Sequence, residues 1–88
     1  MKLIFSDEAW EDYLYWVEVD AKAHKRLNDL IDECRRTPFK GKGKPEPLKG
    51  DLQGWWSRRI TKDDRLVYRV EGKGNDQRLE IAQCRLHY

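Results

Sequence analysis

The residues best suited to chemistry lie in a basic segment from Lys40 to Arg69 and at the end of the chain. The segment holds nine of the 18 lysine and arginine residues against four acids, which gives it a local charge of +5. One carboxylate, Glu46, stands between two prolines within it, and His87 is the penultimate residue. Carboxylate and imidazole groups move protons in catalysis, and fixed cations stabilise developing negative charge. The chain therefore offers a candidate base, a candidate acid and several cations.

Cleavage of RNA without a metal needs three kinds of group around one phosphate. A base takes the proton of the ribose 2′-OH, an acid protonates the departing 5′ oxygen, and cations stabilise the charge on the phosphate. Glu46, His87 and Arg65 fit these three roles in turn, and Arg59 or Lys49 could add a further cation. The alternative is a solvated charged face, since 39% of the residues are charged.

The chain terminus bears on the assignment of His87. The α-carboxylate of Tyr88 is covalently close to His87 and favours the imidazolium, which is the form that donates a proton, while nearby cations oppose this effect. Tyr88 and Trp55 are candidates for stacking on a nucleobase. The alternative interpretations are a frayed tail for His87 and Tyr88 and a core position for Trp55.

Two helices should support the basic segment. A strand is expected at Lys2 to Phe5, and Ser6 is a candidate N-cap for a helix that begins at Asp7. Apolar residues at i, i+3, i+4 and i+7 then form one stripe of this helix: Trp10, Tyr13, Leu14 and Val17. Asp20 is a second candidate N-cap, and a second helical repeat runs until Pro38 prevents its continuation. The pattern predicts a helical hairpin.

Three later runs are typical of strands. Trp55–Ile60, Leu66–Val70 and Arg78–Leu86 are separated by turn-like segments, and this order predicts an antiparallel meander. Proline and glycine between Thr37 and Gly54 predict a long loop. The expected fold class is α+β, with a short N-terminal strand, a two-helix hairpin and an antiparallel sheet of three further strands.

Alternation along the strands predicts which side chains share a face. Leu66, Tyr68 and Val70 should pack on the helices, so Arg65 should face outward, unless a bulge changes the alternation. The outward face would then carry Arg59, Arg65, Arg85 and His87. The long loop would cover it with Lys42, Lys44, Glu46 and Lys49. Such a face has the charge of a nucleic-acid site.

Length and composition restrict the class of protein. Eighty-eight residues are expected to form one domain, 1–88. No apolar run approaches the roughly 20 residues that span a bilayer, and the N-terminus lacks a signal-peptide pattern, so a cytoplasmic protein without membrane contact is expected. Cys34 and Cys84 could form one disulfide, but nothing else suggests a secreted, disulfide-stabilised protein, so they are interpreted as buried thiols. No metal-ligand spacing is present, and no cofactor is expected.

The sequence closely resembles the YoeB toxins of the RelE superfamily, which are ribosome-dependent mRNA endonucleases. The resemblance spans nearly the whole chain, in the stretches MKLIFSDEAWEDYLYW, RRTPFKGKGKPEPLKGDLQGWWSRRI, DRLVYRV and CRLHY. It implies a RelE-like fold and cleavage of mRNA in the A site of the 70S ribosome. The departures are Phe5, where the family often has Trp, and a longer turn at Gly72 to Arg78.

The resemblance also implies residue roles and partners. Glu46 would be the general base, His87 the general acid and Arg65 the stabiliser of the transition state. Lys49 and Arg59 would bind phosphate, and Tyr88 would hold the terminus and the substrate. A YefM-like antitoxin and a homodimer are implied as well. The alternatives are a non-catalytic ParE-like toxin that inhibits gyrase and a plain RNA-binding protein.

Overall fold

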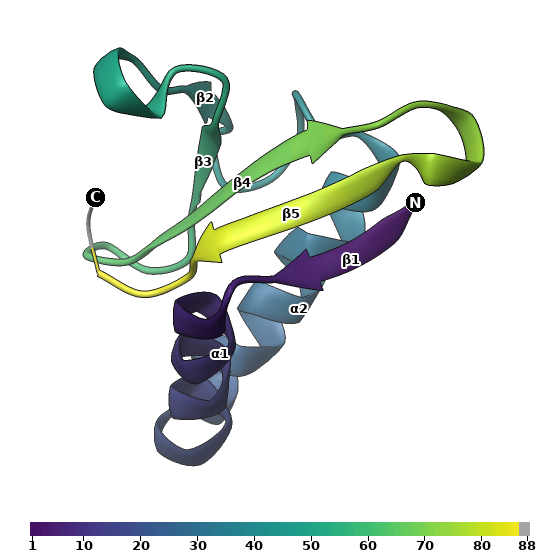
Figure 1. The fold of residues 1–88 in the computed structure, drawn as a ribbon. Coiled ribbons are helices and arrows are strands. Elements are labelled where there is room, and N and C mark those ends of the chain that lie inside the picture. Colours follow the sequence, from purple (N-terminus) through teal and green to yellow (C-terminus); the bar gives the residue numbers. More distant parts are fainter. Residues whose placement is uncertain (87–88) are drawn as a thin grey trace.

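The structure, a computed structural model, describes residues 1–86 and confirms the α+β class. Helices and strands follow each other much as the sequence predicts, with one additional two-residue strand in the long loop (Figure 1). The elements are β1 (Lys2–Phe5), α1 (Asp7–Val19), α2 (Ala21–Arg36), β2 (Glu46–Pro47), η1 (Gly50–Leu52), β3 (Trp56–Arg59), β4 (Arg65–Glu71), η2 (Gly74–Asp76) and β5 (Arg78–Gln83). Neither α-helix of the described chain has the length and apolar character needed to cross a membrane.

Both predicted helix caps are confirmed. The hydroxyl of Ser6 accepts a hydrogen bond from the backbone N–H of Ala9 at 3.0 Å. The carboxylate of Asp20 accepts bonds from the backbone N–H groups of Lys22 and Ala23 at 3.1 and 3.0 Å. These side chains partner N–H groups that have no acceptor within the first turn of a helix. Local sequence thus places the start of each helix.

The sheet has the strand order β1-β5-β4-β3-β2. β3, β4 and β5 form the predicted antiparallel meander, β2 adds to the free edge of β3, and β1 pairs with β5 in parallel. A bulge between Val67 and Tyr68 makes Val67 pair with Gln83 and Tyr68 with Ile81. The sheet is therefore mixed, and β1 and β2 form its two edges.

The core lies between the sheet and the helices. Leu66 and Tyr68 of β4 are fully buried there, and Val70 packs against them in part, as alternation predicts. Leu27 and Leu30 of α2 face them from the helical layer with no exposed surface. Burial of each such side chain contributes about 1.5–3 kcal/mol. One face of the sheet thus packs against the helices, and the opposite face is turned away from them.

The predicted stripe of α1 is largely exposed. Trp10, Leu14 and Val17 keep between 44% and 48% of their surface accessible, and the helix buries Ala9 and Trp16 instead. The indole N–H of Trp16 donates to the backbone carbonyl of Cys84 at 2.8 Å, which ties this face of the helix to the end of the sheet. A long-range contact therefore decided which face of α1 is buried.

The last strand is shorter than predicted, because it ends at Gln83 and not at Leu86. The backbone N–H of Cys84 donates to Asp12 of α1 at 3.0 Å, and its carbonyl accepts from Trp16. Helical side chains thus take both backbone groups that a longer strand would use in pairing. After Gln83 the chain follows α1 and leaves the sheet.

A candidate active site on the outer face of the sheet

The register of the strands brings Glu46, Arg59 and Arg65 to one face of the sheet. Glu46 pairs with Ser57 across β2 and β3, and Arg59 pairs with Arg65 across β3 and β4. Residues directly opposite each other in antiparallel strands share a face. The neighbouring Arg58 is fully buried on the core side, so this shared face is the outer one. The prediction that Arg65 faces away from the helices is confirmed.

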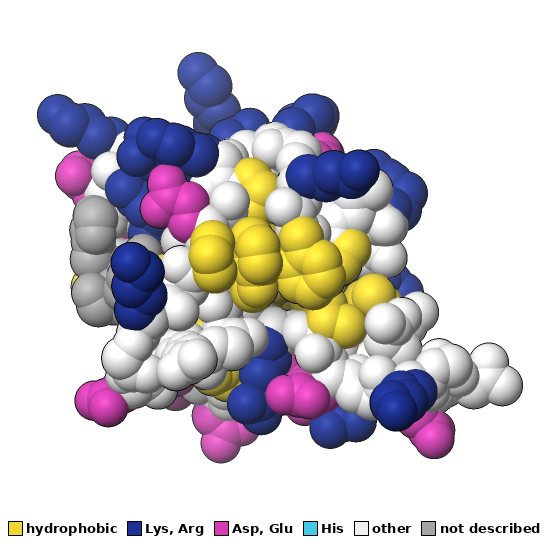
Figure 2. Space-filling model, turned by 90° about the horizontal axis from the view of Figure 1, so that it is seen from above, with side chains coloured by type: hydrophobic (Ala, Val, Ile, Leu, Met, Phe, Trp, Pro, Cys, Tyr) yellow, Lys and Arg dark blue, Asp and Glu magenta, His cyan; other side chains and the backbone are white. Residues whose placement is uncertain are grey.

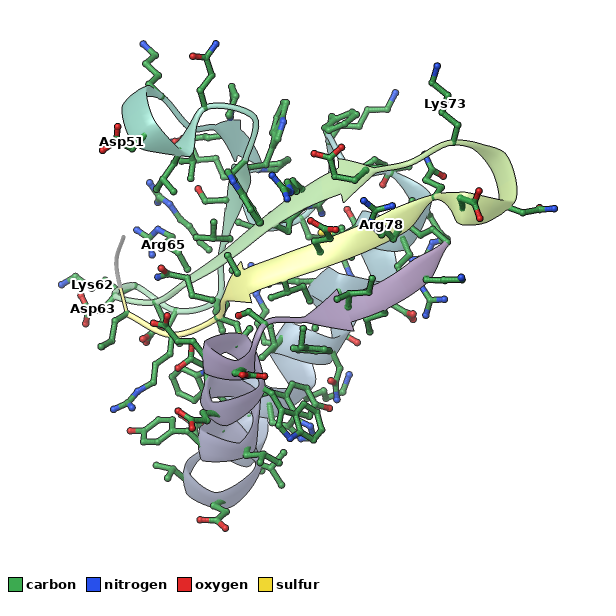
Figure 3. The ribbon with its side chains drawn as sticks, viewed as in Figure 1. Asp51, Lys62, Asp63, Arg65, Lys73 and Arg78 are labelled. Carbon is green, nitrogen blue, oxygen red and sulfur yellow. The ribbon has the colours of Figure 1, made fainter. Side chains whose placement is uncertain are left out.

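The spacing within this face suits a bound phosphate. Glu46 and Arg65 lie two strands apart and two residues apart along the strands, so their Cα atoms are separated by on the order of 12 Å. A glutamate and an arginine that extend toward each other leave room for one phosphate group between them. Figure 3 shows Arg65 at one end of β4, beside Lys62 and Asp63, and Lys73 at the other end.

The carboxylate of Glu46 is accessible. Its side chain keeps 52% of its surface exposed, and among residues 1–86 it forms an ion pair with Lys44, 3.9 Å away. Both side chains are exposed, so this ion pair is weak. The carboxylate is therefore free to accept a proton from a bound molecule.

The guanidinium of Arg65 is fixed at one end and open at the other. Its Nη1 donates to the backbone carbonyls of Thr61, Lys62 and Asp64 at 3.0 to 3.2 Å. Within the described part of the chain, Nε and Nη2 have no hydrogen-bond partner. An arginine held in this way presents two oriented donors to an anion, which is the geometry that binds a phosphate oxygen pair.

Two further cations have exposed side chains. Arg59 lies at the end of β3 and Lys49 precedes η1. η1 and β2 lie at the top of Figure 1, and Figure 2 views the molecule from that side. There, lysine and arginine side chains stand around a group of apolar side chains in the middle of the face. The basic residues thus form a rim around apolar surface.

The prediction that Arg85 belongs to this face was wrong. Its guanidinium carbon lies 3.6 Å from the centre of the Tyr15 ring, so Arg85 contacts α1. The cause is the early end of β5, after which strand alternation no longer applies. His87 and Tyr88 lie outside the described residues. Leu86 is described, and its carbonyl accepts a 3.0 Å bond from the backbone N–H of Arg65.

Other arginines of the outer face already have partners. Arg69 and Arg78 each donate to Glu80 at 2.7 Å, and these bonds, from Arg78 first and Arg69 second, lower the pKa of the Glu80 carboxyl. Arg69 also lies over the ring of Trp55, 4.4 Å from its centre. Trp55 is half-buried and stacks on a cation. Arg69 and Arg78 are therefore less available to an anion than Arg59, Arg65 and Lys49, for whose side chains the described residues offer no acidic partner.

Sequence reasoning missed the role of Arg58, which it counted among the basic residues of the segment. Arg58 is fully buried and forms an ion pair with Glu33 of α2 at 3.3 Å. Strand alternation along Trp55–Ile60 places Arg58 on the side opposite Arg59, together with the apolar Ile60, and this was the available signal. A charged residue on the core side of a strand needs buried partners.

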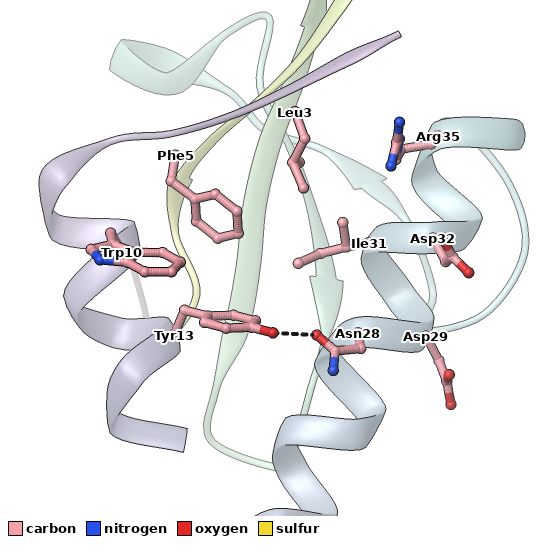
Figure 4. Close-up of a pocket in the computed structure, with 9 residues that line it drawn as sticks. All are labelled: Leu3, Phe5, Trp10, Tyr13, Asn28, Asp29, Ile31, Asp32 and Arg35. Atoms are coloured by element: carbon pink, nitrogen blue, oxygen red, sulfur yellow. Dashed lines mark hydrogen bonds between the residues drawn. The ribbon is translucent and has the colours of Figure 1, made fainter. Parts of the chain in front are cut away.

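The pocket in Figure 4 lies away from the candidate site. It has a volume of about 420 Å³ and is bounded by β1, α1 and α2, with a 2.8 Å hydrogen bond from Tyr13 to Asn28 across it. It contains none of Glu46, Arg59 and Arg65. Among residues 1–86, no group of three or more His, Cys, Asp and Glu side chains is placed to hold a metal ion.

Comparison with known proteins gives a consistent result. The family model described as the YoeB-like toxin of bacterial type II toxin-antitoxin system matches residues 5–88. Toxin YoeB of Escherichia coli K12 is 60% identical over the full length of both chains. The solved YoeB/ParE toxin from Agrobacterium tumefaciens is 57% identical over both full chains, with a TM-score of 0.97.

The YoeB protein of Staphylococcus aureus has been solved as a dimer and in a heterotetrameric complex with YefM. In both structures it is 42% identical to this chain, with TM-scores of 0.88 and 0.87, and the match covers 100% of this chain and 98% of the solved one. The TM-scores of these solved relatives agree with the fold described above. The chain therefore belongs to the YoeB-like toxins of bacterial type II toxin-antitoxin systems.

Proposed function

We propose that this toxin is a ribosome-dependent endoribonuclease that cleaves mRNA in the ribosomal A site and thereby inhibits translation. The observation that carries the proposal is the shared outer face of Glu46, Arg59 and Arg65, which combines one accessible carboxylate with two guanidinium groups. A carboxylate near a phosphate-binding site weakens RNA binding by repulsion, so its presence there favours a catalytic role.

The proposed reaction is an attack of the ribose 2′ oxygen on the adjacent phosphorus. Glu46 removes the 2′-OH proton, the new O2′–P bond forms, and the P–O5′ bond breaks. His87 donates a proton to the departing 5′ oxygen. The products are a 2′,3′-cyclic phosphate, which can open to a 3′-phosphate, and a 5′-hydroxyl end. Protein side chains fill every role, so the proposal requires no cofactor and no metal.

The cations act on the charge that develops at the phosphate. Arg65 presents two donors fixed by its bonds to the preceding turn, and electrostatic stabilisation of this kind needs no reorganisation during the reaction. Lys49 and Arg59 would bind the same or the adjacent phosphates. Tyr88 would hold the chain terminus and the substrate in place.

The partners follow from the family. The S. aureus relative forms a dimer and a complex with YefM, and we propose that this chain likewise forms a homodimer and is neutralised by a YefM-like antitoxin. Its substrate would be mRNA on the 70S ribosome, so the protein would act in the cytoplasm. The repeated positive charge around the face of Figure 2 suits a ribosomal RNA surface.

Two other functions compete with this one. A ParE-like toxin would inhibit gyrase without catalysis, and a plain RNA-binding protein would need only the basic residues. Neither function calls for Glu46, Arg65 and His87 together. Gyrase supercoiling measured in the presence of the purified toxin tests the first, and RNA binding without strand breakage would support the second.

Primer extension on a translated message tests the proposal. The wild-type protein should produce discrete cuts within codons in the A site, and none when ribosomes are omitted. His87→Gln should reduce cutting by about 10²- to 10⁴-fold while ribosome binding is retained. Equal cutting of free RNA by the wild type, or full activity of the His87 variant, would contradict the proposed mechanism.

A further inference from the structure

The side chain of Arg58 uses all of its hydrogen-bond donors inside the protein. A guanidinium has five N–H donors, and here each has an acceptor within 3.3 Å. Nε donates to the hydroxyl of Tyr68 and Nη1 to the carboxylate of Glu33. The remaining three donors bind backbone carbonyls of the segment before β2, those of Thr37, Lys40 and Lys42.

The segment from residue 37 to 44 therefore wraps around a buried cation. The hydroxyl of Tyr68 donates to the carbonyl of Pro38 at 2.5 Å, and Glu33 accepts the backbone N–H of Lys42 at 2.6 Å. At Gly41, where φ is +117°, a Cβ atom would lie 1.6 Å from a carboxylate oxygen of Glu33. The glycines of the GKGK sequence thus permit a close approach of backbone to side chains.

This segment leads directly into β2, which carries Glu46. β2 has two residues and pairs with β3 alone, and the carboxylate of Glu46 has one weak ionic contact in the described chain. Arg58 binds the segment before β2 through its side chain. Its backbone directly follows Ser57, the residue of β3 that pairs with Glu46. The backbone N–H of Arg59 adds a 2.7 Å bond to the carbonyl of Gly43.

We propose that Arg58 is the positioning residue of the general base: it fixes the 37–44 segment so that Glu46 reaches the ribose hydroxyl. This inference rests on the proposed nuclease function for its catalytic part. Arg58 has no contact with substrate in this scheme, because its side chain is buried on the opposite face of the sheet from Glu46.

Arg58→Lys is the direct test. Lysine keeps the charge but has three donors on a flexible stem, so it cannot bind all five acceptors. The expected result is a loss of about 10²-fold in kcat on programmed ribosomes with little change in KM, because a displaced catalytic group affects the chemical step. Arg78→Lys is the matched control: Arg78 also pairs with a glutamate, yet lies away from β2, and its variant should retain full activity.

A double-mutant comparison separates positioning from loss of folded protein. In a Glu46→Gln background, Arg58→Lys should cause no further loss, because the base is already absent. If Arg58→Lys only lowered the fraction of folded protein, it would reduce the cleavage rate by the same factor in the wild-type and Glu46→Gln backgrounds. That result would overturn the proposal. Unchanged kcat in the Arg58→Lys single variant would also overturn it.

Gly41→Ala perturbs the same 37–44 segment without replacing Arg58. Its Cβ atom would collide with Glu33, so the segment must shift and kcat should fall as in Arg58→Lys. Gly54→Ala is its control, since Gly54 also has a positive φ (+96°) but no atom within 4 Å of an added Cβ. Full activity of Gly41→Ala together with a folded structure would contradict the proposal. This pair remains informative if Arg58→Lys fails to fold.

Limited trypsin digestion tests the structural part without reference to RNA. Lys40 and Lys42 are exposed and precede glycines, yet their carbonyls are bound by Arg58. The wild type should be cut slowly at these two lysines, and both Arg58→Lys and Gly41→Ala should be cut faster there while Gly54→Ala is not. If the wild type cleaves no mRNA, the proposed function fails, but the digestion still decides whether Arg58 holds the segment. Equal digestion of all four proteins would overturn the inference.

Discussion

The backbone N–H of Leu86 donates a 2.7 Å hydrogen bond to the carboxylate of Asp64. Leu86 has a φ of +63°, in a region that a leucine rarely adopts and that costs about 1–2 kcal/mol. Its carbonyl is bound by the backbone N–H of Arg65, so both backbone groups of Leu86 are held by adjacent residues of one turn. The residue that precedes His87 in the chain is therefore attached to the residue that carries the candidate phosphate-binding guanidinium.

We expect Asp64→Ala to weaken this attachment. It removes the acceptor of the Leu86 N–H and also that of the Thr61 hydroxyl, 2.6 Å from the other carboxylate oxygen. The free energy of unfolding, measured with urea, should fall by about 1–3 kcal/mol, and mRNA cleavage should fall with it. Asp64→Asn retains a carbonyl acceptor and should recover part of the stability and part of the cleavage activity. Asp63→Ala is the control, because Asp63 is exposed in the same turn. Equal stability of the Asp63 and Asp64 variants would contradict this account.

Glu46→Gln should abolish most of the activity and leave the fold intact. The side chain is half exposed and its one ionic contact in the described chain is weak, so stability should change little. Loss of a general base should slow single-turnover cleavage by about 10²- to 10⁴-fold, with ribosome binding retained. Asp51→Asn removes an exposed charge from neighbouring η1 and serves as the control. Wild-type rates in Glu46→Gln would remove this residue from the mechanism.

The stability of the protein should depend on pH through Glu33. The backbone N–H of Lys42, and then the side chain of Arg58, lower the pKa of the Glu33 carboxyl from its ordinary value of 4.5. A carboxyl with a lowered folded pKa stabilises the fold above its unfolded pKa, and this contribution disappears as pH falls through the folded value. The difference in unfolding free energy between the wild type and Glu33→Gln should therefore shrink as the pH is lowered from 6 to 3. A constant difference over this range would show that the charge of Glu33 makes no contribution.

The two cysteines should resist alkylation in the native protein. Both are free and fully buried, as the sequence predicted for buried thiols. Burial raises the pKa of Cys34 to about 11 and that of Cys84 to about 12, so the reactive thiolate is scarce at pH 8. Mass spectrometry after brief treatment with iodoacetamide should find neither residue modified until urea unfolds the chain. Rapid modification of either in the folded state would indicate local opening.

Local features of the sequence predicted much of the fold. The caps at Ser6 and Asp20 and the alternation of Leu66 and Tyr68 depend on residues within a few positions of each other, and the structure confirms them. The similarity of the sequence to the YoeB toxins also identified the family, and the proposed roles of Glu46, Arg65 and His87 derive from that similarity together with the residue types.

Contacts between residues far apart in the sequence determined the rest of the fold and of the candidate site. Glu46 and Arg65 share a face because β2 pairs with β3 in one register and β3 pairs with β4 in another, and no local pattern specifies either register. Arg85 contacts Tyr15 because α1 binds the backbone of Cys84 and ends β5 early. Arg58 is buried because acceptors from α2, β4 and the 37–44 segment converge on it, and the free energy of a buried charge depends on partners that only the folded chain brings together.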